Sequence, residues 1–376
     1  MDMTYKLPHP VRLCCTELKE LEIEKQDEFF DFIFSDLDLE SSSMGYLTSI
    51  LKNAAPNIFE YYVSQGLTEH NADMAVTTML VPYKFRKLNG NILTTSNEID
   101  FLLEKTDIGN EIPISYVRPP FKCCYIEFTE DRLSSLRVYN EESGEHILEG
   151  VYLSEVEIFP GSLQMASYEK SEHFLNLFSK SFNKNESFRI IDIMFTGSPV
   201  GKMNNADDAL RVQAFYVFDD KLTIKDELGL IIERFGSDDD FCNDVNYLSI
   251  ILEHMAKVLL FTNCKQYRDT AFNEREELEK KINSIKSPGK LKKYSNKLRR
   301  TYNRLVIKPQ DNIVYTSDVN NKHSNGHNPK RAHWRKGHFR MQPYGPGATS
   351  RKIIFIEPTV VGGVFAEKKS YNVREK

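Results

Sequence analysis

The first hundred residues carry apolar side chains at helical spacing. The acidic, aromatic segment from Glu17 to Asp38 contains no Gly or Pro, and residues 47–55 repeat apolar side chains at steps of three or four up to Pro56. This spacing puts the apolar side chains on one face of a helix, and a proline disfavours helical geometry in the residue before it. Residues 58–88 mix helical and extended signals. We therefore predict an acidic, mainly helical region over residues 1–115.

The pattern changes after Pro120 to short runs that are rich in aromatic and β-branched residues. Polar or Gly-containing turns separate four such runs, which are residues 121–128, 149–159, 188–197 and 212–218. Runs of this length and composition are typical of strands, so we predict an antiparallel sheet of at least four strands. We expect a short helix from Ser171 to Phe182, and a polar connector from Asp207 to Arg211.

The clearest helix of the chain comes next. Apolar side chains recur at steps of three or four from Phe241 to Phe261 without Gly or Pro, and Asp239 and Asp240 suit the positive end of the helix dipole. We expect this helix to pack on the sheet, so that residues 116–264 form an α+β core. His254 lies beside the apolar stripe, where a packed or rim histidine is more common than a ligand.

The remainder of the chain is strongly basic. From residue 265 onward, 26 Lys and Arg stand against 10 Asp and Glu, a formal charge of +16, whereas the first 264 residues hold 23 against 44, a charge of −21. This asymmetry favours a polyanion as the partner of the basic end, or an acid–base match within the molecule, and both can hold together.

Two basic helices are predicted at the start of this region, which spans residues 265–376. Residues 273–286 form the first, Ser287 to Gly289 break it, and residues 289–305 form the second, with an apolar stripe ending at Leu305. The opposite face of the second helix carries charges of one sign, which repel each other unless an anionic partner neutralises them. Its cations are Lys290, Lys292, Lys293, Lys297, Arg299, Arg300 and Arg304.

A compact terminal module follows a predicted flexible linker at residues 317–332. Two imidazoles, three cations and two aromatic rings fall within residues 333–340, and Tyr344 to Gly347 predict the turn of a β-hairpin. A bulge at Gly337 would bring His333, Arg335, His338 and Arg340 to one face. The candidate residues for binding RNA or the ribosome are His333, Trp334, Arg335, Lys336, His338, Arg340, Tyr344, Arg351 and Lys352.

Three interpretations of this module stay open on the residues alone. Guanidinium groups bind phosphates and aromatic rings stack on bases, which makes the module a surface for RNA. Alternatively, His333 or His338 acts as the general acid or base of a metal-independent RNA endonuclease. In the third interpretation the hairpin is structural, or a non-catalytic binding module. No catalytic residue is assigned, because composition alone does not place a nucleophile.

Metal, cofactor and membrane functions are not indicated. The adjacent pairs Cys14–Cys15 and Cys123–Cys124 are expected to give one buried and one half-exposed thiol each, since neighbours on a strand point to opposite faces. His323 and His327 have a spacing that suits zinc on a helix, but they lie in an Asn- and Gly-rich stretch. The chain has no apolar run long enough to span a membrane and no apolar signal core near Met1, so we expect a cytoplasmic protein.

The terminal module resembles the C-terminal signature of a family carried by phages and other mobile elements. The signature has the form H-x-R-x-G-H-[WF], then G-x-G, then I-x-P and a final V-G. The matching positions are His333, Arg335, Gly337, His338, Gly345, Gly347, Pro358 and Val361. A fainter resemblance extends upstream to the strand Pro119–Glu127 and the helix of residues 245–261.

The resemblance implies a function other than that of a conventional inhibitor of an effector nuclease. The family includes a type V-A anti-CRISPR protein that lowers expression of the effector nuclease, and its function implies recognition of the nascent N-terminal peptide of that nuclease and loss of its messenger RNA. The implied partners are that nascent peptide and RNA or the ribosome, in the cytoplasm of a bacterial host, with no cofactor. The implied role is evasion of host defence by a mobile element.

Overall fold

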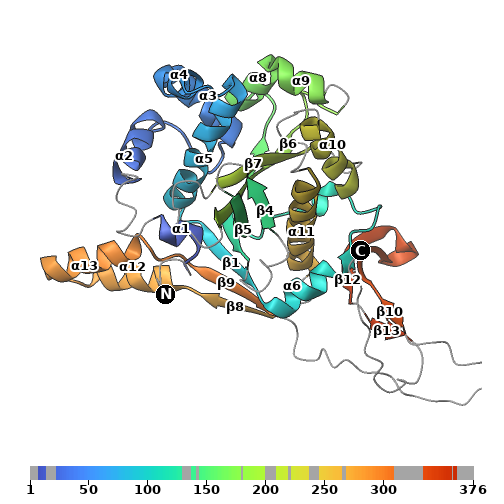
Figure 1. Ribbon diagram of the computed structural model, residues 1–376. Coiled ribbons are helices and arrows are strands. Elements are labelled where there is room, and N and C mark those ends of the chain that lie inside the picture. The colour runs from blue at the N-terminus through green and yellow to red at the C-terminus, as the bar shows by residue number, and fades with distance from the viewer. Residues whose placement is uncertain are drawn as a thin grey trace, which may run out of the picture.

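The computed structural model of the protein is an α+β fold in which helices cover both faces of a central sheet (Figure 1). It describes residues 7–13, 23–128, 137–140, 144–178, 181–199, 209–218, 222–236, 245–264, 268–308, 333–357 and 359–361. The sheet strands among them are β1 (Asn91–Thr95), β3 (Cys123–Glu127), β4 (Arg137–Asn140), β5 (Gly144–Ile158), β6 (Phe188–Pro199), β7 (Ala209–Val217), β8 (Arg268–Phe272) and β9 (Arg304–Lys308).

The sheet has the strand order β7-β6-β5-β3-β1-β9-β8, with β4 beside β5. The neighbours β7, β6, β5 and β3 are antiparallel, which confirms the predicted four-stranded antiparallel sheet. The strands β3, β1 and β9 are parallel, and β8 is antiparallel to β9. Because β1 precedes residue 116 and both β8 and β9 follow residue 264, all three sequence regions contribute to one sheet.

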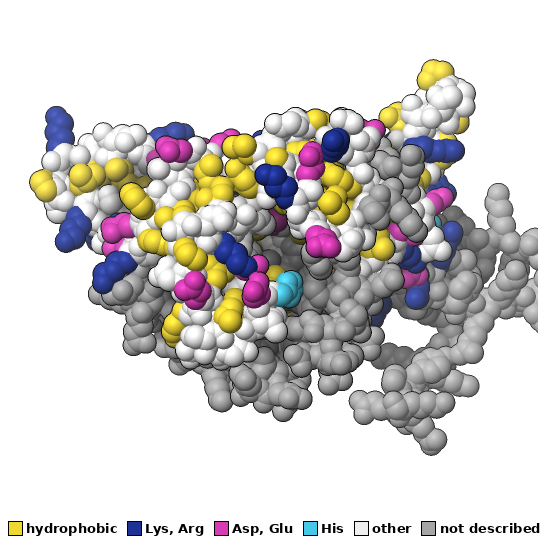
Figure 2. All heavy atoms as spheres, turned by 90° about the horizontal axis from the view of Figure 1, so that it is seen from above, with side chains coloured by type: hydrophobic (Ala, Val, Ile, Leu, Met, Phe, Trp, Pro, Cys, Tyr) yellow, Lys and Arg dark blue, Asp and Glu magenta, His cyan; other side chains and the backbone are white. Residues whose placement is uncertain are grey.

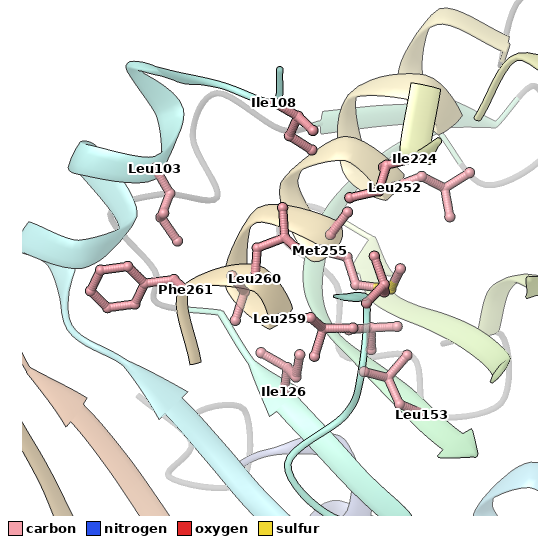
Figure 3. Close-up of a cluster of buried hydrophobic side chains, with 14 of the residues drawn as sticks. Leu103, Ile108, Ile126, Leu153, Ile224, Leu252, Met255, Leu259, Leu260 and Phe261 are labelled. Atoms are coloured by element: carbon pink, nitrogen blue, oxygen red, sulfur yellow. The ribbon is translucent and has the colours of Figure 1, made fainter. Parts of the chain in front are cut away.

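One face of the sheet is covered by α11 (Val245–Cys264), together with α6 (Asn97–Glu104) and α10 (Ile224–Gly236). Figure 3 shows Leu259 of α11 close to Ile126 of the sheet, and Leu252 close to Ile224 of α10; Met255 and Leu153 belong to the same cluster. This confirms the predicted core helix, although residues 239–244 lie outside the described part of the chain. His254 is a packed residue, 7% exposed, with its ring centroid 5.7 Å from that of Phe128.

The other face is covered by an N-terminal helical layer. Its elements are α1 (His9–Arg12), α2 (Ile23–Ile33), α3 (Met44–Ala54), α4 (Pro56–Ser64) and α5 (Glu69–Lys87). The mixed signals of residues 58–88 therefore correspond to helices. Along β3, Cys123 and Tyr125 pack under this layer, while Cys124 and Ile126 pack under α11. Both thiols are buried, so the expectation of a half-exposed cysteine is wrong for this pair: alternation does not expose a residue when both faces are covered. Cys14 and Cys15 lie outside the described residues.

A short connector between α2 and α3 fastens this layer to the rest of the molecule. Lys84 Nζ donates to the Ser42 carbonyl at 2.6 Å, and the Met44 amide donates to Asp192 Oδ2 at 3.0 Å. The Gln164 side chain donates to the Ser41 carbonyl and accepts from the Ser43 amide. Side chains from α5, β6 and the helix that contains Gln164 thus satisfy the connector's backbone groups, which would otherwise be costly to bury.

A third cluster covers the far end of β5, β6 and β7. The predicted helix from Ser171 to Phe182 is present as α9 (Glu172–Phe178), and α8 (Leu163–Lys170) precedes it. Phe174 and Phe178 of α9 lie with Phe188 in a buried aromatic group. Ser162 caps α8 by accepting a hydrogen bond from the Met165 amide.

Two predicted element boundaries are wrong. The expected connector from Asp207 to Arg211 overlaps β7, because Ala209 pairs with Thr196 in the sheet; Asp207 itself lies outside the described residues. The second basic helix is α13 (Pro288–Leu298), and it does not continue to Leu305, which lies in β9. The chain leaves the helix because Tyr302 is buried with its ring 5.0 Å from that of Phe85, and β9 then pairs with β1.

Candidate nucleic-acid interface

The terminal module contains the predicted β-hairpin. Its strands are β11 (Gly337–Tyr344) and β12 (Ser350–Ile356), and β11 also pairs in parallel with β2 (Thr106–Asp107). The turn includes the short 3-10 helix η5 (Pro346–Ala348). Gly345 and Gly347 adopt positive φ angles of 79° and 65°, a conformation that glycine adopts without steric cost. The glycine spacing that predicted the turn is therefore explained by its geometry.

The inner face of the hairpin is part of the protein core. Phe339 pairs with Phe355, and the neighbouring pair on the same face is Met341 and Ile353. The Phe355 ring lies 5.2 Å from both the Phe339 ring and the Phe261 ring of α11. Phe339 is 1% exposed. These contacts hold the hairpin against the long core helix and fix which of its faces points outward.

The outer face collects four of the predicted residues. Strand alternation places His338, Arg340, Gln342 and Tyr344 on this face of β11, with Lys352 directly opposite Gln342 on β12. Arg340 and Lys352 are exposed, and Tyr344 is 49% exposed. Arg340 donates to Gln342 Oε1, and Lys352 Nζ lies 5.8 Å from the Tyr344 ring centroid. The result is a cationic, aromatic strip on a rigid support.

The other predicted residues of the module lie elsewhere. His333, Trp334 and Arg335 form β10 (His333–Arg335), which pairs with β13 (Thr359–Val361) in a separate two-stranded sheet. The expectation of one bulged strand that joins them to His338 is therefore wrong, because the pairing partner changes at Lys336. Arg335 is exposed, and Lys336 Nζ lies 3.8 Å from Asp107 Oδ2. Arg351 is exposed on the opposite face of the hairpin, since it pairs with Pro343.

The predicted basic helices form a second cationic element. We define the arm as α12 (Glu274–Asn283), α13 and the loop between them; it extends from the β8–β9 edge of the sheet (Figure 1). The break between the helices is confirmed, with Pro288 at the start of α13, where proline is tolerated. Lys292, Lys293 and Lys297 are on α13 and exposed. Arg299 and Arg300 follow its last residue.

Arg304 does not belong to the basic helix face, which corrects the prediction. It lies in β9, where its guanidinium donates to Glu127 and to Thr94 Oγ1. The carboxylate of Glu127 also accepts from Thr94 at 2.9 Å. Arg304 is thus committed to a half-buried polar group that joins three neighbouring parallel strands. Its charge was correctly read as part of a basic run, but sequence spacing does not show that the run crosses from helix to strand.

The two cationic elements lie at opposite ends of the molecule. In Figure 1 the arm extends on one side of the central sheet, and the terminal hairpin lies on the other side beyond α11. They are therefore two separate surfaces, whereas the sequence places both within one basic segment. Three more lysines of the arm, Lys280, Lys281 and Lys286, were not among the predicted site residues. The signal for them is that the whole stretch of residues 280–300 contains no Asp or Glu.

The described part of the chain shows neither a metal cluster nor a membrane span. No group of three or more His, Cys, Asp or Glu among those residues has the arrangement to hold a metal ion. The residues 317–332, with His323 and His327, lie outside it. No helix in the described ranges is both long and apolar enough to cross a membrane.

Comparison with known proteins gives a family match and a similar solved structure. A sequence model of the anti-CRISPR type V subtype A2 family, described as AcrVA2-like, matches residues 94–363. The chain is also similar to the crystal structure of AcrVA2, at 11% sequence identity and a TM-score of 0.44, over 92% of this chain and 94% of that chain. No curated protein matches the chain.

Proposed function

The chain belongs to the anti-CRISPR type V subtype A2 family, and from this premise we propose that it lowers expression of a type V-A effector nuclease. In this proposal the protein recognises the nascent N-terminal peptide of the nuclease and promotes loss of the messenger RNA that encodes it. The family membership itself implies an interaction with a component of a CRISPR system. The nascent chain and the messenger are the specific partners that we propose.

The outer face of the hairpin is the observation that supports an RNA or ribosome contact most directly. Arg340, Lys352 and Tyr344 lie together on it, with His338 at its other end. Cations can bind phosphates there, and an exposed phenol ring can stack on a base. Because Phe339 and Phe355 anchor the opposite face, the strip is held in place before any partner binds, which lowers the entropic cost of binding.

The charge of the rest of the protein suits recognition of a nascent peptide. The first 264 residues carry a formal charge of −21, so they repel the phosphates that the basic end attracts. An RNA or ribosome contact at the hairpin therefore leaves the acidic body turned away from the polyanion. A nascent peptide, which is not a polyanion, is the partner that such a body can still approach.

Messenger abundance in bacteria tests the proposal. Cells would express a type V-A effector together with the protein, with an Arg340→Ala, Lys352→Ala variant, or with Arg351→Ala as the matched control on the opposite hairpin face. We expect selective loss of the effector messenger with the wild type and the control, and its recovery with the double variant. All three residues are exposed, so the substitutions should change the free energy of unfolding by less than about 0.5 kcal/mol each.

The pattern of loss separates this proposal from an RNA endonuclease. Broad loss of unrelated messengers, together with metal-independent cleavage of naked RNA by the purified protein, would favour direct cutting with His333 or His338. Equal messenger levels with and without the protein would refute the proposed function. Loss that persists fully in the double variant would refute the hairpin strip as the contact, while leaving the family function in place.

A further inference from the structure

The arm holds a continuous cationic run that nothing within it neutralises. From Lys280 to Arg300 the sequence contains nine Lys and Arg and no Asp or Glu. Among the described residues, Arg299 has a carboxylate partner, Glu24 of α2, and the other eight cations have none. Like charges at this density repel one another, so the isolated arm is electrostatically unfavourable. A polyanionic partner would remove that cost.

The position of the arm makes these charges accessible. None of the residues of α13 is buried, and Lys286, Lys290, Lys292 and Lys293 are all exposed. At the left end of Figure 2, where the arm reaches furthest from the body, Lys and Arg side chains project in several directions. The arm is thus an extension whose surface is available on more than one side.

The acidic residues of the arm are confined to its base, on the first turns of α12. There Glu276 accepts from Asn303, and Glu279 pairs with Arg275 at 3.1 Å. The base of the arm carries both signs, because Arg275 donates to the Leu298 carbonyl and so places the end of α13, with Arg299, beside the first turn of α12. The outer part of the arm, around the loop between the two helices, carries only cations. A polyanion is therefore attracted most strongly to the outer part, where no carboxylate of the arm opposes it.

The residue types of the arm fit phosphates better than they fit bases or a protein. Tyr294 is the one aromatic side chain within α12 and α13, and Lys281 Nζ already lies 4.7 Å from its ring centroid. Protein interfaces draw on well-packed apolar anchors, whereas the main exposed apolar residue on α13 is Leu291, at 40%. Binding to phosphates needs no apolar anchor, because release of condensed counterions supplies the free energy.

We infer that the arm binds the phosphate backbone of RNA, without reading its sequence, as a contact separate from the hairpin strip. The inference deepens the proposed function and rests on it for the presence of RNA near the protein. The two contacts lie at opposite ends of the molecule, so a long RNA can engage both while a short one engages either. Binding at the arm depends on charge and salt, and binding at the hairpin depends also on the Tyr344 ring.

The salt dependence of RNA binding by the purified full-length chain tests the inference. Fluorescence anisotropy would follow a labelled single-stranded RNA of about 20 nucleotides and mixed sequence, with salt raised from about 50 to about 300 mM. The test variant is Lys290→Gln, Lys292→Gln, Lys293→Gln. The matched control removes three exposed lysines of the body by the same substitution, at Lys170, Lys184 and Lys225.

The expected result is a change of slope. Each phosphate contact contributes about 0.7 to the slope of log affinity against log salt for a single strand, so loss of three contacts should reduce it by about 2. The arm variant should also bind more than tenfold more weakly at the lowest salt, and the control should stay within twofold of the wild type. An unchanged slope in the arm variant, with wild-type affinity, would overturn the inference.

Two further outcomes discriminate between partners. If polyglutamate displaces the labelled RNA more strongly than unlabelled RNA does at equal concentration of charge, the arm prefers acidic protein surfaces, and the inference is wrong. If two RNAs of equal length and unrelated sequence differ more than tenfold in affinity for the arm, readout of bases replaces the phosphate contact. The assay contains no CRISPR effector, so a failure of messenger repression in cells does not alter its result.

Discussion

Lys84 and Asp192 are buried on the same side of the sheet, and they bind backbone groups two residues apart at the start of α3. Lys84 donates to the Ser42 carbonyl at 2.6 Å, and Asp192 accepts from the Met44 amide at 3.0 Å. The two side chains line one small internal cavity together with Ser154 and Cys123. Two opposite charges thus stabilise the entry to α3 from both sides, and they are excluded from water by the helical layer above them.

The pKa values of both groups reflect this burial. Desolvation raises the pKa of Asp192 to about 6, although the nearby Lys84 charge opposes the shift. Desolvation also lowers the pKa of Lys84, and the Asp192 carboxylate is the largest opposing influence. Each charge therefore makes the other less costly, and we expect the loss of either one to be felt by its partner.

The first prediction concerns pH. Because the folded-state pKa of Asp192 lies above the unfolded value of about 3.9, the native state binds more protons between about pH 4 and pH 6. The contribution of this group to the free energy of unfolding therefore falls as pH rises through that window, by up to about 1.4 kcal/mol per pH unit. Denaturant unfolding from pH 4 to pH 7 should show this phase in the wild type. It should vanish in Asp192→Asn but persist in Asp36→Asn, an exposed control; identical profiles would contradict the assignment.

The second prediction concerns the cation of the pair. Lys84→Met leaves the Ser42 carbonyl without its donor and Asp192 without its nearest positive charge, so we expect a loss of about 3 kcal/mol at neutral pH. Lys87→Met, on the exposed side of the same helix, should lose less than about 1 kcal/mol with its surface ion pair to Asp31. The pH phase of Asp192 should also move above pH 6 in Lys84→Met, and an unmoved phase would show that the two groups do not interact.

The third prediction uses two glycines with opposite surroundings. A Cβ on Gly150 would lie 2.3 Å from the Tyr125 hydroxyl and 2.5 Å from the Ile126 carbonyl, so Gly150→Ala should be destabilising, by about 2 kcal/mol. A Cβ on Gly229, inside α10, meets nothing within 4 Å. Gly229→Ala should therefore stabilise the helix by up to about 1 kcal/mol. Thermal unfolding measures both; the prediction does not survive if the two shifts have the same sign.

The fourth prediction concerns the attachment of the hairpin. Phe355→Ala removes the ring that contacts both Phe339 and Phe261, and we expect a cost of about 3 kcal/mol. Hydrogen exchange should accelerate in β11 and β12. Ile354→Ala, the neighbouring outward position, should leave those amides protected. Equal exchange in both variants would show that the inner face does not hold the hairpin.

Local periodicity was sufficient to predict much of the fold. The apolar repeat of α11 and the aromatic runs of β3, β5, β6 and β7 appear in the structure as expected, because the first has one dominant period and the others have the composition of strands. The hairpin was likewise predictable, since the turn glycines and the flanking strands are adjacent in sequence. Elements whose signal is local are recovered from local patterns.

Long-range pairing explains what the sequence did not show. Leu305 continues an apolar helical stripe, yet it lies in β9 because the strand fills the place between β1 and β8. The exposure of Cys123 was misjudged because the helical layer above it comes from residues far earlier in the chain. Lys84 carried no signal at all: a lysine within a helix reads as exposed, and its partner Asp192 is more than a hundred residues away.

Some features of the candidate site were likewise predictable from local patterns, and others depend on long-range pairing. The outward positions of Arg340, Tyr344 and Lys352 follow from strand alternation once the inner face is known, and Phe339 was a reasonable indication of that face. The separation of β10 from β11 depends on β2 and β13, which are short strands with no periodic signal. The distance between the arm and the hairpin is likewise a property of the whole sheet.

The most direct test of the central claim separates the peptide from the message. Cells would carry a reporter fused behind the N-terminal codons of a type V-A effector, in one version recoded with synonymous codons and in another shifted in frame by compensating single-nucleotide changes. We predict that expression of this protein removes the recoded messenger, whose peptide is intact, and spares the frame-shifted messenger, whose RNA is nearly unchanged. Loss of the frame-shifted messenger, with the recoded one spared, would contradict nascent-chain recognition.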